Sequence, residues 1–192
     1  MGDSITYGHG VSRSEVWPAV ASKLSDHTFI NCGVSGETTG QMKARFKAQV
    51  INEKPDFVFI IGGANDFFFI GPHSIYDAQA NLADMAFEAR EHNIVPILGT
   101  NLNVCAETLN DFFKTIVDLN TANPTIIRHR ELLKKFCEAN KFEYIDFNEI
   151  LQQASTFDDM RDLIFDGLHP DSKSHAILAK AVAELPLLNN VK

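Results

Sequence analysis

The sequence predicts an α/β protein in which helices cover both faces of a parallel sheet. Four apolar segments have the composition of buried strands, namely residues 28–31, 57–62, 94–99 and 142–146. Because their apolar residues run continuously rather than alternate, we expect each strand to be covered on both faces. Helical patterns lie between these segments, and strands that alternate with helices form parallel sheets. We therefore predict a three-layer α/β/α sandwich.

The predicted helices follow from apolar spacing and from start and stop signals. They span residues 15–24, 39–52, 74–91, 109–119, 124–140 and 171–185. Pro18 lies in the first turn of the first helix, where a missing N–H is tolerated. Pro55 follows the second helix as a stop signal.

The composition limits the domain organisation and the partners. A chain of 192 residues predicts a single domain, residues 1–192, and the 17 basic against 25 acidic residues give a net charge of −8. This charge disfavours nucleic acid and anionic membranes, so we expect a small neutral substrate. No apolar run reaches the ~20 residues of a stable membrane insertion, and no signal peptide is seen, which predicts a cytoplasmic protein. The oligomeric state is left open.

A Ser, a His and an Asp near opposite ends of the chain supply the parts of an activated nucleophile. Ser4 follows Gly2-Asp3, and Asp166 precedes His169 by three residues in a compact turn. From there Asp166 can accept from the imidazole Nδ1–H and fix its tautomer, while Pro170 biases His169 away from helical backbone. The alternative is a plain turn with a surface histidine. A Gly-x-Ser-x-Gly elbow is absent, because the nearest run ends at Glu37.

Four segments of the chain resemble the motifs of the SGNH hydrolases, also called the GDSL esterase/lipase family. Residues 2–8 resemble the first motif, 31–38 the second, 62–66 the third and 166–170 the last. The resemblance covers essentially the whole chain, with the motifs in the right order. It implies a flavodoxin-like sheet of about five strands and ester hydrolysis without metal or organic cofactor.

The resemblance also implies a role for each motif. Ser4 becomes the nucleophile, and Asp166 and His169 complete a catalytic triad. The backbone N–H groups of Ser4 and Gly33, with the side-chain amide of Asn65, become an oxyanion hole.

Two further segments are predicted walls of a substrate pocket. Phe67 begins an apolar run directly after the third motif, and Thr100, Asn101 and Asn103 follow the third apolar strand. Core packing for the phenylalanine and loop capping for the polar residues are the alternatives.

Two acids within the motifs and the six other histidines of the chain are expected to have structural rather than catalytic roles. Asp3 and Asp66 are interpreted as acceptors that organise loops. The six other histidines, at positions 9, 27, 73, 92, 129 and 175, show no paired metal spacing and are expected at the surface.

The predicted function is hydrolysis of carboxylic esters by a Ser-His-Asp mechanism. The resemblance to the SGNH hydrolases implies short acyl, lysophospholipid, thioester or acetylated-sugar substrates. Two alternatives remain, which are acyl transfer on the same site and a non-catalytic carbohydrate-binding module of the same fold. Measuring free acid against transferred product, with an added acceptor, distinguishes hydrolysis from acyl transfer. Labelling by a fluorophosphonate distinguishes an active hydrolase, which is labelled at Ser4, from a binding module, which is not.

The turn at Gly2-Asp3-Ser4 should follow a strand, but Met1 alone precedes it in this sequence. A doubly wound sheet places its first strand centrally, where unpaired backbone groups are costly. We therefore expect an apolar segment of about five to eight residues upstream of Met1, or a strand supplied by another chain.

Overall fold

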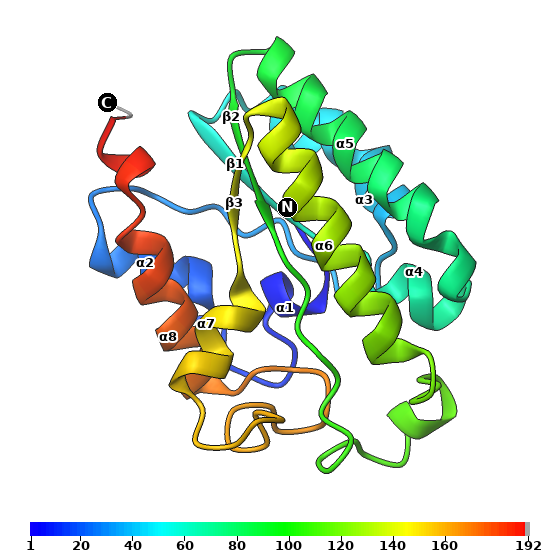
Figure 1. Cartoon of the computed structure of the whole chain (residues 1–192). Coiled ribbons are helices and arrows are strands. Elements are labelled where there is room, and N and C mark those ends of the chain that lie inside the picture. The colour runs from blue at the N-terminus through cyan, green and yellow to red at the C-terminus, as the bar shows by residue number, and fades with distance from the viewer. Residues whose placement is uncertain (191–192) are drawn as a thin grey trace.

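A parallel sheet lies between two layers of helices in the computed structural model, which describes residues 1–190 (Figure 1). Its strands are β1 (Phe57–Ile61), β2 (Val95–Gly99) and β3 (Glu143–Ile145), in the order β1-β2-β3. Phe57 pairs with Val95, and Ile97 pairs with Glu143. These three predicted strands are confirmed within one residue at each end.

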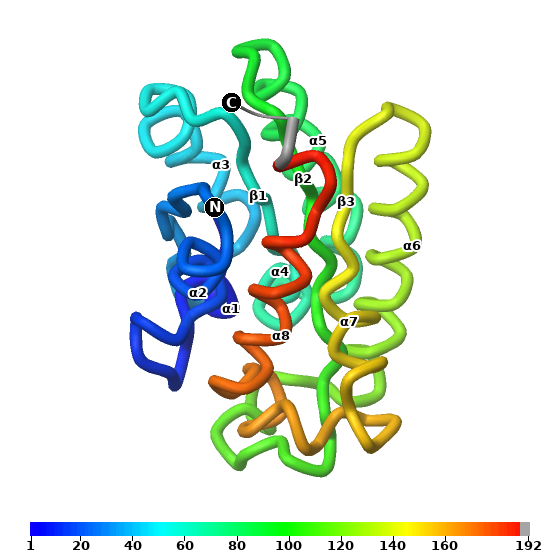
Figure 2. The backbone as a smooth tube through the Cα atoms, turned by 90° about the vertical axis from the view of Figure 1, so that its left-hand side faces the viewer, coloured from blue at the N-terminus to red at the C-terminus, as the bar shows by residue number. Residues whose placement is uncertain are grey.

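The helices divide between the two faces of the sheet (Figures 1 and 2). One layer contains α2 (Trp17–Leu24), α7 (Phe147–Ala154) and α8 (Ser172–Ala183), and the other contains α3 (Thr39–Phe46), α5 (Ile75–Glu91) and α6 (Ala122–Asn140). Phe59 and Ile61 pack into the core on the first side, whereas Val58 and Ile60 pack into the core on the second. The continuous apolar runs thus serve two cores, as predicted for strands covered on both faces.

Short elements and helix ends differ from the sequence prediction. Residues 39–52 form α3 followed by a π-helical turn (Lys47–Ile51), and 3₁₀ turns span Pro72–Ser74, Phe113–Thr115 and Pro186–Asn190. Three short helices were not predicted, namely α1 (Ser4–Tyr7), α4 (Ala64–Phe69) and α7. One or two helical turns carry too few apolar repeats to give a periodic signal.

The predicted helix at 109–119 is wrong, since only the turn Phe113–Thr115 forms there. The side chain of Asn110 accepts from the Phe113 N–H at 2.9 Å, and that of Asp118 accepts from the Asn120 N–H at 3.0 Å. Such local side-chain bonds compete with a continuous helix.

Met1 and Gly2 lie beside β1 and extend the hydrogen-bonded ladder. The Ile61 N–H donates to the Met1 carbonyl at 3.2 Å, and Gly2 forms parallel bridges to both Ile61 and Gly33. The predicted strand at 28–31 is wrong, because these residues have no regular partner. The rings of His27 and Phe29 pack against Phe57, and a groove of about 720 Å³ is lined by both this segment and the first half of β1. The expectation of an upstream or foreign strand stays a prediction.

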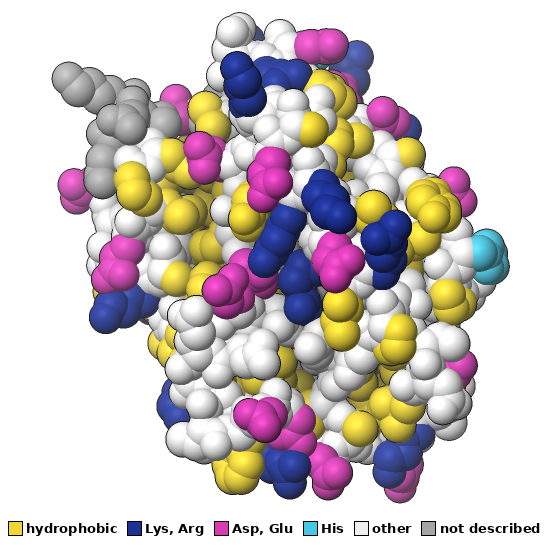
Figure 3. Space-filling view, in the orientation of Figure 1, with side chains coloured by type: hydrophobic (Ala, Val, Ile, Leu, Met, Phe, Trp, Pro, Cys, Tyr) yellow, Lys and Arg dark blue, Asp and Glu magenta, His cyan; other side chains and the backbone are white. Residues whose placement is uncertain are grey.

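The described surface adds two observations. Within residues 1–190, no helix combines the length and the apolar character needed to cross a membrane. The face seen in Figure 3 interleaves acidic and basic side chains, with hydrophobic side chains between them.

Candidate active site

The first motif forms a tight turn that places Ser4 at the start of α1. The Asp3 carboxylate caps this helix by accepting from the Ile5 N–H at 3.1 Å. Gly8 ends the helix with φ of 86°, a left-handed conformation that favours glycine. Because Ser4 is the first helical residue, its own N–H has no partner within the helix. The turn therefore offers a hydroxyl and a free backbone donor at the same place.

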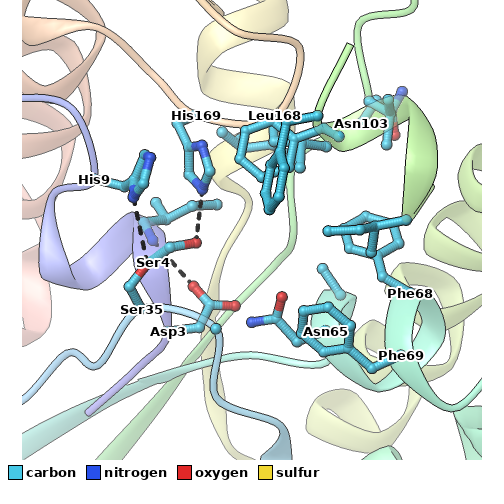
Figure 4. A pocket seen from close by; sticks show the side chains of 18 residues that line it. Asp3, Ser4, His9, Ser35, Asn65, Phe68, Phe69, Asn103, Leu168 and His169 are labelled. Carbon is cyan, nitrogen blue, oxygen red and sulfur yellow. Dashed lines mark hydrogen bonds between the residues drawn. The ribbon is translucent and has the colours of Figure 1, made fainter. Parts of the chain in front are cut away.

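The last motif brings Asp166 and His169 to this hydroxyl. The Nε2 atom of His169 lies 2.9 Å from Ser4 Oγ (Figure 4). Its Nδ1 atom lies 2.8 Å from Asp166 Oδ2. The other carboxylate oxygen accepts the N–H groups of Leu168 and His169 at 3.0 and 2.8 Å. Gly167 permits this turn, since it has φ of 91° and an added Cβ would lie 2.4 Å from Leu109 Cα. All three predicted triad residues thus meet.

The environment of Asp166 favours its charged form. Burial pushes the pKa of Asp166 upward, but the hydrogen bonds from His169 and from the neighbouring N–H groups outweigh burial and lower it. An ionised Asp166 accepts the Nδ1–H of His169, which leaves Nε2 to accept from the Ser4 hydroxyl. This arrangement can remove a proton from Ser4.

The second motif contributes a different glycine from the one predicted. The Gly33 N–H donates to Asn31 Oδ1 at 2.8 Å, and Gly33 does not line the pocket beside Ser4. Gly36 lines that pocket, has φ of 81° and has nothing within 4 Å of an added Cβ. Its N–H makes no hydrogen bond to any described residue. The Gly33 assignment is therefore wrong, because its donor is already used inside the loop.

The third motif places Asn65 at the predicted position. Asn65 lies in the first turn of α4, is 8% exposed and lines the pocket with Ser4 (Figure 4). Its Nδ2 atom donates to the Glu37 carbonyl at 2.9 Å. A side-chain amide has two N–H donors, so one remains available to a ligand.

Arg45, on α3, joins the loops that carry these donors, a role that no sequence motif indicates. Its guanidinium donates to the Cys32 carbonyl at 2.8 Å, to the Gly2 carbonyl at 3.2 Å and to the Glu37 carboxylate at 2.7 Å. The Arg45 and Glu37 side chains are only 15% and 16% exposed. An arginine can brace several acceptors at once because its planar group carries five donors.

Asp3 and Asp66 are confirmed as acceptors that organise loops. Asp66 accepts from the Thr39 N–H at 2.8 Å and from the Thr39 hydroxyl at 2.7 Å, which ties α4 to α3. Burial raises the pKa of Asp66, and it raises that of Asp3 to about 6.

The pocket beside Ser4 has a volume of about 350 Å³ and is mostly apolar. Its apolar walls come from five parts of the chain, namely α1, α4, the loop after β2, the segment around the Phe113–Thr115 turn and the loop of the last motif. The side chains are Ile5, Ala64, Phe68, Phe69, Leu102, Val104, Phe112, Phe113, Ile116 and Leu168. Polar groups are confined to the Ser4 end and to Asn103.

Three of the four predicted pocket contacts are wrong. Phe67 is buried in the core, with its ring 5.1 Å from that of His129. Thr100 donates to the Asp146 carboxylate at 2.7 Å, and Asn101 is buried away from the pocket. Of the four, only Asn103 lines the pocket, and its Oδ1 accepts from Arg130. The neighbours of Phe67 on α4 face the pocket instead, since a helix turns successive side chains in different directions.

Possible metal ligands occur together at one place in the described chain. The ligand atoms of His9, Asp166 and His169 lie within 4.8 Å of one another. Asp166 and His169 already bond each other, and the His9 and His169 rings are stacked 30° from parallel. Stacked rings direct their lone pairs along similar lines rather than at one point, so this cluster fits the triad better than an ion.

Comparisons with known proteins agree with this geometry. Residues 1–177 match the model of the GDSL-like Lipase/Acylhydrolase family. The chain is 26% identical to an acetylxylan esterase of Geobacillus stearothermophilus over 164 residues, 79% of this chain and 68% of that protein. It is 36% identical to the esterase TesA of Pseudomonas aeruginosa over 110 residues, so the match spans 53%, about half, of each protein.

Solved structures share the fold over nearly the whole chain. A GDSL-like lipase from Bacteroides thetaiotaomicron aligns with a TM-score of 0.74 and 26% identity, over 96% of this chain and 85% of that one. A member of the lipolytic G-D-S-L family from Veillonella parvula aligns with a TM-score of 0.78 and 19% identity, over 97% and 95% of the two chains. As the four sequence motifs predicted, the chain belongs to the GDSL-like lipase/acylhydrolase family of ester-hydrolysing enzymes.

Proposed function

We propose that the protein is a serine esterase that acts on esters with short to medium apolar acyl groups. The observation that carries this proposal is the pair of hydrogen bonds that links Ser4 Oγ, His169 and Asp166 at 2.9 and 2.8 Å. Nucleophile, base and orienting acid at such distances are the geometric signature of nucleophilic acyl transfer.

The reaction proceeds in two halves. Ser4 Oγ attacks the acyl carbon while His169 Nε2 takes the hydroxyl proton, and Asp166 stabilises the resulting imidazolium. His169 then gives this proton to the leaving alkoxide, which departs as the alcohol. In the second half His169 takes a proton from water, the hydroxide attacks the acyl-enzyme, and Ser4 regains its proton as the acid leaves.

The oxyanion of each tetrahedral intermediate needs donors aimed at the pocket. The N–H groups of Ser4 and Gly36 and the second amide N–H of Asn65 are the groups that this site offers. One such donor is worth about 2.7–4 kcal/mol in the transition state. Asn65 and Gly36 both line the pocket with Ser4, which supports this assignment.

The acyl preference rests on the lining of the pocket. The acetylxylan esterase relative points toward small acetyl groups on sugars, whereas Phe68, Phe69 and Ile116 give this pocket a wall suited to a longer chain. Each methylene that becomes buried contributes about 0.8 kcal/mol, or about fourfold in kcat/KM when the transition state gains it. An apolar pocket of about 350 Å³ therefore favours butyryl to hexanoyl esters over acetyl esters.

A series of p-nitrophenyl esters from acetate to octanoate tests this proposal. We expect kcat/KM to rise about fourfold per methylene at first and then to level off as the pocket fills. Phe69→Ser should flatten the rise, because Phe69 lines the pocket. Tyr76→Ser is the matched control, since Tyr76 is an exposed aromatic residue outside the pocket.

Other outcomes would contradict the proposal in distinct ways. A maximum at acetate, with acetylated xylo-oligosaccharides preferred, would assign the site to sugar esters. Acyl transfer to an added alcohol in excess of free acid would make the protein a transferase. No turnover of any ester, with intact folding, would favour a binding module.

A further inference from the structure

The imidazole of His9 lies against that of His169 although the proposed reaction gives His9 no step. The ring centroids are 4.3 Å apart and the ring planes differ by 30°, which is a stacked arrangement. Figure 4 shows the two rings side by side near Ser4. His9 is half-buried and lines the same pocket.

The backbone of His9 is tied directly to Ser4. The N–H groups of Gly8 and His9 both donate to the Ser4 carbonyl, at 2.9 and 3.0 Å. Gly8 precedes His9 and turns the chain back with a left-handed backbone. An added Cβ at Gly8 would lie 2.1 Å from a methyl carbon of Val16. Ser4 and His9 therefore belong to one tight turn.

His169 belongs to a different part of the chain, so contacts from outside its own loop must hold its ring relative to Ser4. Its partner Asp166 lies in the same loop, so the bond between them orients the ring but does not fix the loop relative to Ser4. The Ser4–His169 hydrogen bond does cross between the two parts, but it changes as the proton moves. The lasting ring contacts from outside this loop come from His9 and from Phe113, at 4.3 and 5.4 Å.

We propose that His9 is a positioning residue whose ring face holds His169 in line between Asp166 and Ser4. This inference rests on the proposed serine esterase function. Ser35 Oγ of the second motif lies 3.4 Å from His9 Nδ1 and so contacts the edge of the ring. The stack therefore connects the nucleophile turn, the Gly36 loop and the catalytic base.

The charge state of His9 suits this role. Burial, followed by the nearby His169, lowers the pKa of His9 and so favours its neutral ring. A neutral aromatic face attracts a cation placed over it, and His169 becomes cationic during each proton transfer. The stack thus supports His169 most when it carries the proton.

Three variants test the proposal through the ring face and the ring nitrogens separately. His9→Ala removes both and should lower kcat roughly three- to tenfold, with KM within about twofold, because an aromatic contact contributes about that factor. His9→Phe keeps the face alone and should restore most of the lost kcat. His92→Ala is the matched control, since it removes an exposed histidine outside the pocket.

The rate at which a fluorophosphonate labels Ser4 gives a second readout that does not depend on substrate binding. His9→Ala should slow labelling by the same factor as kcat, and His9→Phe should restore it. His9→Leu, which keeps apolar volume without an aromatic face, replaces His9→Ala if that variant fails to fold.

The result that overturns this inference differs from the one that overturns the proposed function. If the wild-type protein is labelled at Ser4 but His9→Ala matches it in kcat and labelling rate, the positioning role is wrong. If His9→Phe is as slow as His9→Ala, a ring nitrogen matters and the stacking account fails. If the wild-type protein is not labelled at all, the serine esterase proposal itself fails.

Discussion

His169 Nε2 lies 2.9 Å from Ser4 Oγ, although 165 positions separate the two residues in the chain. Ser4 begins α1, and His169 lies in the loop that leads into α8. Both residues line the same pocket. The contact therefore depends on the packing of the first and last parts of the chain, and a change to either partner should affect catalysis more than folding.

Asp166→Asn should lower kcat strongly while leaving KM little changed. The asparagine oxygen can still accept from the Leu168 and His169 N–H groups that now bond Oδ1. Its NH₂ group cannot accept the Nδ1–H of His169, so the imidazole is stabilised in the wrong tautomer. A loss approaching about 10⁴ in kcat is expected from this cause. Steady-state kinetics measure it, and a loss below tenfold would contradict the triad assignment.

Asn65→Ala should lower kcat about 10²- to 10³-fold with little change in KM, because the amide donor acts mainly on the transition state. The variant also loses the bond to the Glu37 carbonyl, so thermal unfolding must be measured beside the kinetics. An increase in KM alone would make Asn65 a ground-state binding residue instead.

Gly36→Ala tests the reassignment of the second donor. Gly36 has φ of 81°, which a side chain disfavours, so the substitution should shift the loop and its N–H. We expect kcat to fall by at least about tenfold, with the melting temperature lowered by only a few degrees, because the added Cβ strains the backbone but meets nothing within 4 Å. Unchanged kcat would remove Gly36 from the oxyanion hole.

Arg45→Lys should lower activity although Arg45 does not line the pocket. A lysine retains the charge but cannot reach the Gly2 and Cys32 carbonyls and Glu37 together, as the guanidinium does. The two loops that carry Ser4 and Gly36 should then separate slightly, and we expect kcat to fall by roughly tenfold. Lys43→Met, which removes an exposed cation on the same helix, should retain wild-type kcat. Equal activity of Arg45→Lys and wild type would contradict the bracing role.

The free energy of unfolding should fall as the pH decreases from about 6.5 to about 4. His129 and His175 are fully buried, and burial lowers the pKa of each from 6.5 to about 4. Over this interval the unfolded chain binds these two protons more readily than the folded chain, so their stabilisation is complete above pH 6.5 and is lost toward pH 4. Asp3 acts in the opposite sense, since its pKa is raised to about 6 and its stabilisation is lost as the pH rises through that value.

Urea unfolding at several pH values measures this slope, at most about 1.4 kcal/mol per pH unit for each histidine. His175→Asn keeps an acceptor near the Trp17 N–H, which now donates to His175 Nδ1 at 3.3 Å, but cannot titrate. Its slope should be shallower than that of the wild type, whereas the exposed control His92→Asn should keep the wild-type slope. An unchanged slope in His175→Asn would contradict the account.

The sequence predicted the elements that have a long apolar signal. β1, β2, β3 and the longer helices were placed closely because their apolar runs continue over several residues. Residues 28–31 carry a similar signal but form no strand, since pairing depends on a neighbouring backbone and not on composition alone. The helix predicted at 109–119 fails because local side-chain bonds form turns there.

The sequence predicted those site residues whose side chains carry the chemistry and stand at a fixed place in a motif. Ser4, Asp166, His169 and Asn65 meet as expected. The prediction of Gly33 fails because two glycines in one motif look alike in the sequence, whereas their hydrogen bonds differ in the structure.

The buried histidines, the Arg45 contacts and the His9 stack were not predicted, because they depend on packing between distant parts of the chain. His129 and His175 were expected at the surface, yet both are fully buried. Helical spacing could have suggested this, since His175 lies on α8 one turn before the buried Leu178 and Ala179. No local signal marks Arg45 as a brace or His9 as a stacking partner.

Covalent labelling of Ser4 tests the central claim most directly. Incubating the intact protein with a fluorophosphonate should add one label per chain, at Ser4, and should abolish hydrolysis in parallel. Ser4→Ala should take up no label, retain the fold and keep less than about a thousandth of the wild-type kcat, because binding and the oxyanion hole alone contribute little turnover. Labelling at another residue, or hydrolysis by Ser4→Ala at more than that level, would contradict the assignment of Ser4 as the nucleophile.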